Sequence, residues 1–300
     1  MNIDELSLEE DEFIVDKNYA FLEFLGQATP TKKPEVTFVV AQPGAGKTGL
    51  AAYSTQEIKQ RNNGTTPINV NADKVAEYHR NYSKLLDYIP EERFRVTRKF
   101  VNPVIKEIQQ TLKNLGVSMV IECTLNSEKK IAFMKELKDA GYKVNINVLS
   151  VDELESRVSC LEREACLLSL GNKSRGIDRE SHDNAYNNMV KTLRKLVDEE
   201  CWDNISIYKR GQNCDIPEKI YETTQKGDLE AIEKIQLERN KQRKIILSNP
   251  EKYQDRLVKT KNVINLYQRN EILREYSIKN LQDLQQDFME KVEDRNNVSR

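Results

Sequence analysis

The stretch AQPGAGKT, residues 41–48, lies between two apolar segments of different character. Residues 36–40 before it read VTFVV, a short run of β-formers typical of a buried strand. After it, the residues LAAY open a helical pattern that extends to about Lys59. The order of strand, glycine-rich loop, Lys-Thr and helix predicts a phosphate-binding loop.

The chemistry of this loop fits a nucleoside triphosphate. Gly44 and Gly46 let the backbone turn so that successive N–H groups face one point, beside the N-terminus of the following helix. Lys47 adds a mobile positive charge, and Thr48 offers a hydroxyl to a magnesium ion. A plain glycine-rich turn, the alternative, does not explain Lys-Thr in this register. We expect ATP and Mg²⁺ to be bound by Gly44, Ala45, Gly46, Lys47 and Thr48.

Composition limits the class of protein. The 300 residues suffice for one large domain or two. A formal net charge of -1 and a pI of about 6.3 give no overall field that attracts long nucleic acid. Charged residues make up 32% of the chain and the mean hydropathy is -0.70, which favours a soluble, helix-rich protein.

We expect the protein to act in the cytoplasm, away from membranes. The sequence has no apolar run near the ~18 residues that a membrane span needs. Its N-terminus is acidic and lacks the profile of a signal peptide. The 5 cysteines show no metal-ligand spacing and fit reduced thiols, and 2 histidines are too few for a His-rich metal site.

Apolar β-rich runs alternate with helical patterns between residues 36 and 214. This order predicts an α/β fold, a P-loop kinase-like and mostly parallel sheet with helices on both faces. The β-rich runs are Val36–Val40, Ile68–Val70, Val117–Ile121, Val144–Val151 and Ile205–Tyr208. The main helical patterns are Pro103–Leu115, Ser127–Ala140, Asp152–Leu170 and Arg179–Glu200. Because ligands bind at the carboxyl ends of such strands, residues 41–48, 71–73 and 122–124 are expected on one rim.

Two regions flank the predicted core of residues 36–214. Residues 1–35 form an acidic leader with a short helix at Asn18–Leu25. Residues 215–300 contain no strand-like run, so we expect a helical C-terminal region, broken at Asn249-Pro250. One apolar stripe runs along its end, formed by Leu281, Leu284, Phe288 and Val292. A helical hairpin packed on the core is favoured over a partner-binding module.

A kinase needs a group beside the γ-phosphate that accepts the proton of the acceptor hydroxyl. Asp73 follows the second β-rich run and lies on the expected rim. The alternative is that Asp73 is the N-cap of a helix beginning at Lys74, a role that aspartate also favours. Position alone does not separate the two interpretations.

The order of these motifs resembles the zeta toxins of bacterial toxin–antitoxin systems, which are kinases acting on UDP-N-acetylglucosamine. The resemblance spans roughly residues 36–210. The family's loop has the form G-Q-P-G-x-G-K-T, which residues 41–48 match except that Ala41 replaces the first glycine. Its second strand ends in D-x-D, whose second acid is the catalytic base. The base falls on Asp73, and Asn71 replaces the first acid.

The resemblance also implies acceptor-binding residues. The family's V-I-E-G-T motif is matched by VIECT at 120–124, so Glu122 and Thr124 inherit the contact with the sugar nucleotide. A basic residue that follows this motif in the family is Asn126 here. An acid on the helix before the third strand is expected near the acceptor, and Glu107 takes that place.

Two arginines are implied as phosphate-binding catalytic residues. Arg163 falls on the family's E-R-Y-E-like helix motif, and Arg175 falls on a lid-like segment before a His-Asp pair. Guanidinium groups suit this role because they stay charged and present two donors to phosphate oxygens. The residues alone leave other interpretations open: Arg163 as a surface side chain paired with neighbouring glutamates, and Arg175 as part of a flexible basic loop.

By the same resemblance, the reaction places phosphate on the 3′-hydroxyl of the amino sugar of UDP-N-acetylglucosamine, which removes a cell-wall precursor. The implied partner is a small helical antitoxin that blocks the nucleotide site. Three alternatives remain from the residues. They are a kinase of another hydroxyl acceptor such as a nucleotide, NAD or an antibiotic, a nucleotide-dependent interaction protein, and a chain whose own tail or leader acts as the inhibitor.

Overall fold

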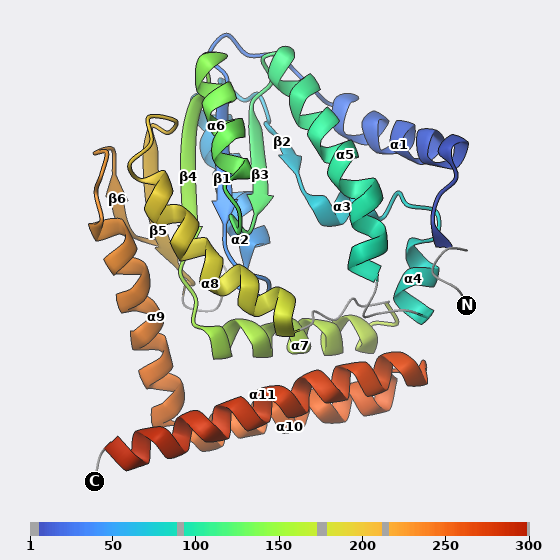
Figure 1. The fold of residues 1–300 in the computed structure, drawn as a ribbon, viewed down its shortest axis with the longest axis vertical. Helices are drawn as coiled ribbons and strands as arrows, with labels where there is room; N and C mark the ends of the chain where they lie inside the picture. Colours follow the sequence, from blue (N-terminus) through green and yellow to red (C-terminus); the bar gives the residue numbers. More distant parts are fainter. Residues whose placement is uncertain (1–5, 89–92, 173–178, 212–215, 299–300) are drawn as a thin grey trace.

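The computed structural model describes residues 6–88, 93–172, 179–211 and 216–298. A six-stranded sheet forms its centre, in the order β2-β3-β1-β4-β5-β6 (Figure 1). The first five of these strands are parallel, and β6 pairs antiparallel with β5. The strands are β1 (Glu35–Val40), β2 (Ile68–Val70), β3 (Met119–Cys123), β4 (Lys143–Leu149), β5 (Asn204–Lys209) and β6 (Glu218–Thr223).

The helices of the core cover both faces of the sheet. In β1, Val36, Phe38 and Val40 face one layer while Val39 faces the other, as alternating side chains of a strand must. The Val39 face packs on α2 (Lys47–Arg61). The opposite face packs on α5 (Arg93–Asn114), α6 (Lys129–Asp139), α8 (Arg179–Leu196) and α9 (Glu230–Ser248). Both layers are buried, which explains why four of the six residues of β1, EVTFVV, are apolar.

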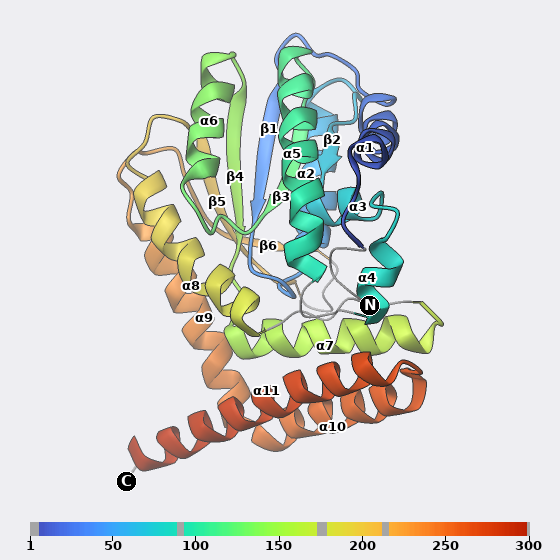
Figure 2. The same ribbon diagram turned by 45° about the vertical axis from the view of Figure 1, so that its right-hand side comes forward.

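The remaining helices lie around the edge and the lower end of the sheet. At the β2 edge, α1 (Glu10–Leu25) packs against α5, near α3 (Ala72–Ala76) and α4 (Tyr82–Tyr88). Beyond the carboxyl ends of the strands lies α7 (Glu153–Ser169). The antiparallel pair α10 (Pro250–Tyr267) and α11 (Glu271–Val298) lies along α7 on the side away from the sheet (Figures 1 and 2).

The helices α10 and α11 share a core with α7 that is separate from the core of the sheet. Leu281, Leu284 and Phe288 of α11 are buried against α7 and α10, and Val292 packs beside them. The predicted apolar stripe is therefore confirmed, and it stabilises a layer beneath α7. The predicted break at Asn249-Pro250 is confirmed too, since α9 ends at Ser248 and α10 begins at Pro250.

The strands and helices predicted for the core are present, but α5 begins at Arg93, ten residues before the predicted start at Pro103. Two further differences lie outside the core. The leader helix is longer than expected, because α1 begins at Glu10, where Glu9 and Glu12 form a reciprocal capping box. The expectation of no strand after Asp215 is wrong, since β6 covers Glu218–Thr223. Its sequence, EKIYET, is mostly polar because β6 is an edge strand, so it lacks the apolar run of a central strand.

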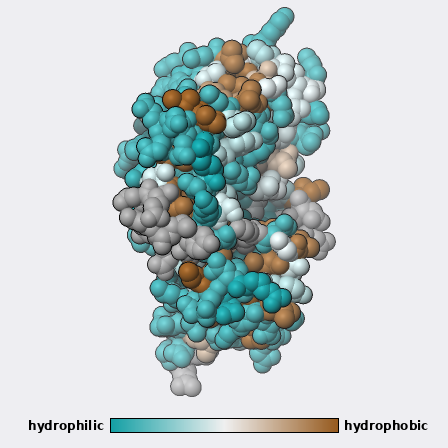
Figure 3. Space-filling model, turned by 90° about the vertical axis from the view of Figure 1, so that its right-hand side faces the viewer, coloured by the Kyte–Doolittle hydropathy of each residue, from teal (hydrophilic) through white to brown (hydrophobic). Residues whose placement is uncertain are grey.

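The surface is mostly hydrophilic where α1 and α4 face the viewer, and its hydrophobic residues lie in separate patches (Figure 3). Within the described ranges, no helix combines the length and the apolar character needed to cross a bilayer.

Candidate active site

A cavity of about 600 Å³ lies at the carboxyl ends of the central strands. Its walls come from the loop after β1, the ends of β2 and β3, and parts of α3, α5 and α7. The structure brings together side chains or glycines from four separate segments that the sequence had marked. Those that line the cavity are Gly44, Gly46, Lys47, Thr48, Asp73, Glu122, Thr124 and Arg163.

The phosphate-binding loop has the backbone that its glycines predict. Gly46 is the N-cap of α2 with φ 100°, and Gly44 has φ 73°, both in the left-handed region that favours glycine. The first turn of α2 contains no acidic residue, so no neighbouring carboxylate in that turn competes for its N–H groups. This end of α2 is suited to bind an anion from the cavity.

Lys47 is held beside the loop. Its Nζ donates to the carbonyl oxygens of Ala41 at 2.9 Å and Gln42 at 3.0 Å. Burial lowers the pKa of Lys47 below its ordinary value, while the charges of Asp73 and Glu122 act in the opposite direction. A phosphate bound in the cavity would favour the charged form of Lys47 further, so anion binding and protonation support each other.

Two residues at the start of the loop fix its position. Ala41 continues β1, is fully buried, and donates its N–H to the carbonyl of Cys123 at 3.3 Å. A glycine is therefore not required where the family has one. The Gln42 amide donates to the carbonyl of Val151 at 2.8 Å and to Ser156 Oγ at 3.1 Å, which ties the loop to the start of α7. Ala45 is fully buried beneath the loop and does not line the cavity with its side chain.

Asp73 lines the cavity and is not the N-cap of α3. That cap is Asn71, whose Oδ1 accepts from the Asp73 N–H at 2.8 Å, and α3 begins at Ala72. The alternative interpretation of Asp73 as a cap for a helix at Lys74 is therefore wrong. The helix needs only one capping side chain, and Asn71 supplies it.

Asn71 also orients Glu122. Its Nδ2 donates to Glu122 Oε1 at 2.9 Å, and Asn69 Nδ2 reaches the same oxygen at 3.4 Å. One amide side chain thus joins the start of α3 to the end of β3. An aspartate at position 71 could still cap α3 with a carboxylate oxygen, but it has no N–H group to donate to Glu122.

Arg163 projects from α7 into the cavity, as the resemblance implied. Arg175 lies outside the described residues. Two further cations line the cavity, Arg98 from α5 and Lys130 from α6, although no motif pointed to them. The lining side chains therefore include four bases (Lys47, Arg98, Lys130, Arg163) and two acids (Asp73, Glu122), a formal excess of two positive charges. This excess favours a polyphosphate ligand.

The sequence shows basic residues near these positions, but it does not show which of their side chains face the cavity. Residues 93–99 read RFRVTRK, with four basic side chains at the start of α5. Only the phase of the helix decides that Arg98 faces the cavity. Lys130 lies four residues after Asn126, which also lines the cavity, so the cation missing at position 126 is supplied from the start of α6.

Glu107 does not line the cavity. Its carboxylate accepts from Lys17 Nζ of α1 at 3.1 Å and is about half exposed. The cavity is lined by Ile105 of the same helix, and a separation of two residues turns a helical side chain by roughly 200°. The assignment of Glu107 to the acceptor site is therefore wrong.

The donors in the cavity fit a magnesium ion that is bound through phosphate. The Thr48 hydroxyl and the carboxylates of Asp73 and Glu122 line the same space, and Mg²⁺ prefers oxygen ligands. Among the described residues, no group of three or more His, Cys, Asp or Glu side chains could hold a metal by itself. Thr48 together with phosphate oxygens would hold the ion here.

The C-terminal helices do not enter the cavity. Within the described part of the chain, the lining residues lie between Pro43 and Ala185, so neither α1 nor α9 to α11 contributes. A tail that inhibits by filling the nucleotide site does not fit this arrangement.

Comparison with known proteins gives a family match over most of the chain. The family model described as zeta toxin matches residues 23–224. Toxin PezT of Streptococcus pneumoniae serotype 4 is 27% identical over 188 residues, which cover 61% of this chain and 72% of PezT. The match to the family model includes the phosphate-binding loop, Asp73, Glu122 and Arg163, and it ends before α9.

One solved structure agrees with this chain at the level of the fold. A chain from the PezAT chromosomal toxin–antitoxin system of Streptococcus pneumoniae superposes with a TM-score of 0.63 at 19% identity, covering 85% of this chain and 98% of that chain. A chain of the complex AvrRxo1-ORF1:-ORF2 with ATP is less similar, with a TM-score of 0.47 at 14% identity, covering 75% of this chain and 70% of that chain.

Proposed function

This chain belongs to the zeta toxin family of toxin–antitoxin systems, and we propose that it is an ATP-dependent kinase that phosphorylates the 3′-hydroxyl of the amino sugar of UDP-N-acetylglucosamine. The family and the kinase-like fold imply nucleotide binding. The observation that supports the rest is a single cavity in which Lys47, Asp73, Glu122 and Arg163 meet. A phosphate-binding loop, a carboxylate base and opposing cations are the parts that phosphoryl transfer requires.

The loop would bind the phosphates of ATP. The N–H groups at the start of α2 and the Nζ of Lys47 would hold the β- and γ-phosphates, and Arg163 would approach the transferring group from α7. A Mg²⁺ ion held by Thr48 and phosphate oxygens would neutralise charge on the leaving diphosphate. Arg175 is proposed as a second cation for the same phosphate, by the resemblance alone.

Asp73 would act as the base. Its carboxylate accepts the proton of the acceptor hydroxyl as that oxygen forms its bond to the γ-phosphorus. The bond from the γ-phosphorus to the bridging oxygen breaks, and ADP leaves. Asp73 faces the cavity while its backbone N–H is fixed by Asn71, so the carboxylate comes from a firmly placed part of the chain.

Glu122 and Thr124 would bind the acceptor. Glu122 is fixed by Asn71 and can accept a hydrogen bond from a sugar hydroxyl, and Thr124 lies two residues further along the same wall. Arg98 and Lys130 provide positive charge on the side of α5 and α6, which suits the diphosphate of a nucleotide sugar. An antitoxin that covers this cavity, and a site of action in the cytoplasm, are part of the same proposal.

Mass spectrometry tests the proposed reaction directly. UDP-N-acetylglucosamine is incubated with ATP, Mg²⁺ and the parent protein, Asp73→Asn, Lys47→Ala or Glu107→Gln. The parent and Glu107→Gln should add one phosphate to the sugar nucleotide, because Glu107 pairs with Lys17 outside the cavity. Asp73→Asn should lose about 10²–10⁴-fold in rate, as for removal of a general base.

The same assay identifies a wrong acceptor. If the parent labels NAD, a nucleotide or an antibiotic and leaves the sugar nucleotide unchanged, the acceptor is wrong while the kinase assignment stands. If the parent binds ATP but labels none of them, the kinase assignment itself is refuted. Loss of activity in Glu107→Gln equal to that in Asp73→Asn would contradict the placement of the site.

A further inference from the structure

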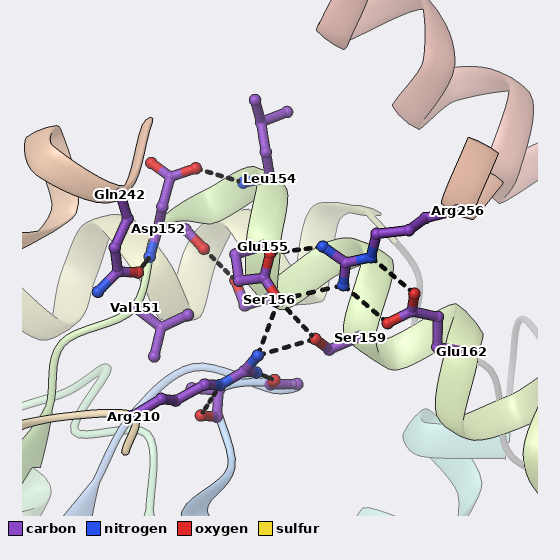
Figure 4. Close-up of polar contacts among 12 residues, drawn as sticks. Val151, Asp152, Leu154, Glu155, Ser156, Ser159, Glu162, Arg210, Gln242 and Arg256 are labelled. Atoms are coloured by element: carbon purple, nitrogen blue, oxygen red, sulfur yellow. Dashed lines mark hydrogen bonds and ion pairs between the residues drawn. The ribbon is translucent and has the colours of Figure 1, made fainter. Parts of the chain in front are cut away.

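Arg210 binds the back of the phosphate-binding loop. It follows directly after β5, and its guanidinium donates to two successive loop carbonyls, those of Gly44 and of Ala45, the latter from Nε at 2.9 Å (Figure 4). Arg210 is not among the residues that line the cavity. It therefore acts on the loop from the side opposite the phosphate.

Holding these carbonyls fixes the direction of the next two N–H groups. In a trans peptide the C=O and the following N–H point in opposite directions within one plane. The Ala45 N–H donates to the carbonyl of Gln42 at 3.3 Å, which closes the turn of the loop. The Gly46 N–H belongs to the second plane and is turned away from Arg210, and Gly46 lines the cavity. Arg210 thus supports the turn that the Ala45 N–H closes, and it orients the Gly46 N–H, which the loop would use to bind phosphate.

The guanidinium of Arg210 is itself held by α7. Its NH1 donates to Glu155 Oε1 and to Ser159 Oγ, each at 3.0 Å. Both side chains are partly buried, with 19% of Arg210 and 23% of Glu155 exposed, so water competes less for these bonds than at an open surface. Ser159 also lines the cavity, so this contact reaches the site wall.

The C-terminal helix α10 completes the network. Arg256 binds Glu155 with two bonds of 2.8 and 3.1 Å, and it binds Glu162 with two bonds of 2.8 Å each (Figure 4). Bidentate contacts of this kind fix the carboxylates in direction as well as position. The hydrogen bond with Glu162, followed by that with Glu155, raises the pKa of Arg256, which keeps it charged.

We propose that Arg210 is a positioning residue for the phosphate-binding loop, and that α10 sets its position through Arg256 and Glu155. The inference deepens the proposed function, because it concerns the same nucleotide site. It also gives the C-terminal region a role in forming the site. The family match ends at residue 224, so the α10 part of the network lies beyond it.

The network acts through geometry. It contains two arginines and two glutamates, so its formal charge is zero and it adds little to the field at the phosphate. Arg210 needs the planar fork of arginine because its three nitrogens bind the carbonyls of Gly44 and Ala45 on one side and Glu155 and Ser159 on the other. A lysine has a single charged nitrogen, which cannot reach both sides at once. Arg210→Lys should therefore fail to restore what Arg210→Gln removes.

Glu155 and Glu162 form a matched pair for the test. Both are on α7 and both bind Arg256, but only Glu155 also binds Arg210. Glu162→Gln therefore measures the loss of packing between α10 and α7 alone. Glu155→Gln measures that loss together with the loss of the contact to Arg210.

The experiment has two readouts on the full-length protein. Hydrogen exchange of peptides covering residues 41–50 is measured without nucleotide, and the dissociation constant for ATP is measured separately. Arg210→Gln and Glu155→Gln should each exchange about tenfold faster in the loop and bind ATP about tenfold more weakly, the scale of one charged hydrogen bond. Arg256→Gln should shift both readouts in the same direction, because Glu155 then loses its partner on α10. No shift in Arg256→Gln would overturn the part of the proposal that concerns α10. Glu162→Gln should stay within about twofold of the parent in both. Thermal unfolding checks that all variants are folded.

A double-mutant cycle tests whether Glu155 acts on the loop through Arg210. Adding Glu155→Gln to Arg210→Gln should change neither readout further, whereas independent sites would give multiplied effects. Multiplied effects, or equal effects of Glu155→Gln and Glu162→Gln, would overturn the inference. If the parent binds no ATP, the proposed function fails, but the exchange of the loop still decides the role of Arg210.

Discussion

The three glycines of the phosphate-binding loop and α2 should respond differently to alanine. Gly44 has φ 73°, and a Cβ there would lie 2.0 Å from the carbonyl oxygen of Ser156 and 2.5 Å from Cys160 Sγ. Gly46 has φ 100°, but its Cβ would meet only ordinary contacts at 3.6 and 3.7 Å. Gly49 is in α2, and nothing lies within 4 Å of its Cβ position.

The structure gives a magnitude for each change. A left-handed backbone costs an alanine about 1–2 kcal/mol, which is the whole expected loss for Gly46→Ala. Gly44→Ala adds an overlap with the backbone of α7, which costs about 1–3 kcal/mol, for a total of about 2–5 kcal/mol. Gly49→Ala should stabilise by about 0.5–1 kcal/mol, because alanine favours a helix over glycine.

Urea unfolding followed by circular dichroism measures all three variants against the parent. The free energy of unfolding should be highest for Gly49→Ala, followed by the parent and Gly46→Ala, and lowest for Gly44→Ala. Equal losses for Gly44→Ala and Gly46→Ala would refute close packing of the loop on α7. A lower free energy of unfolding for Gly49→Ala than for the parent would contradict the open space around that residue.

Three further predictions concern other parts of the protein. Asn71→Asp should keep the cap of α3 but place a second carboxylate beside Glu122, raising KM for the acceptor severalfold in steady-state kinetics, and an unchanged KM would contradict the contact. Burial lowers the pKa of His79, so the unfolded state takes up its proton first and stability should fall as pH drops below about 6.5. His79→Gln should remove up to about 1.4 kcal/mol per pH unit of this slope in urea titrations at pH 5–7.5, and an unchanged slope would refute it. Asp287→Ala should destabilise by about 3–5 kcal/mol in urea unfolding, because it leaves Arg157 buried without this partner, and a loss below about 1 kcal/mol would count against the pair.

The site was predictable where a short stretch of chain carries its own geometry. The loop at 41–48 has its turns, its lysine and its helix within one segment, and the structure shows all of them in place. Asp73 and Glu122 were predictable because the ends of neighbouring parallel strands meet on one rim. Their placement depends on strand order, which the alternation of elements already limits.

Other residues of the site depend on the phase of a helix or on distant partners. Glu107 and Arg98 are on the same helix, and only its rotation puts Arg98 in the cavity and Glu107 against α1. β6 was missed because an edge strand needs few apolar residues, so its polar sequence does not distinguish it from a loop.

The sequence by itself determined the five parallel strands, the phosphate-binding loop and the rim on which Asp73 lies, because these follow from local turns and from apolar periodicity. Only the tertiary structure decided what holds the loop in place. Glu155 is 55 residues from Arg210 and 101 residues from Arg256 in the sequence. No motif or spacing marks the three residues as partners. The packing of α10 on α7 brings Arg256 to Glu155, and the end of β5 brings Arg210 to it, so these contacts exist only after all three elements are placed.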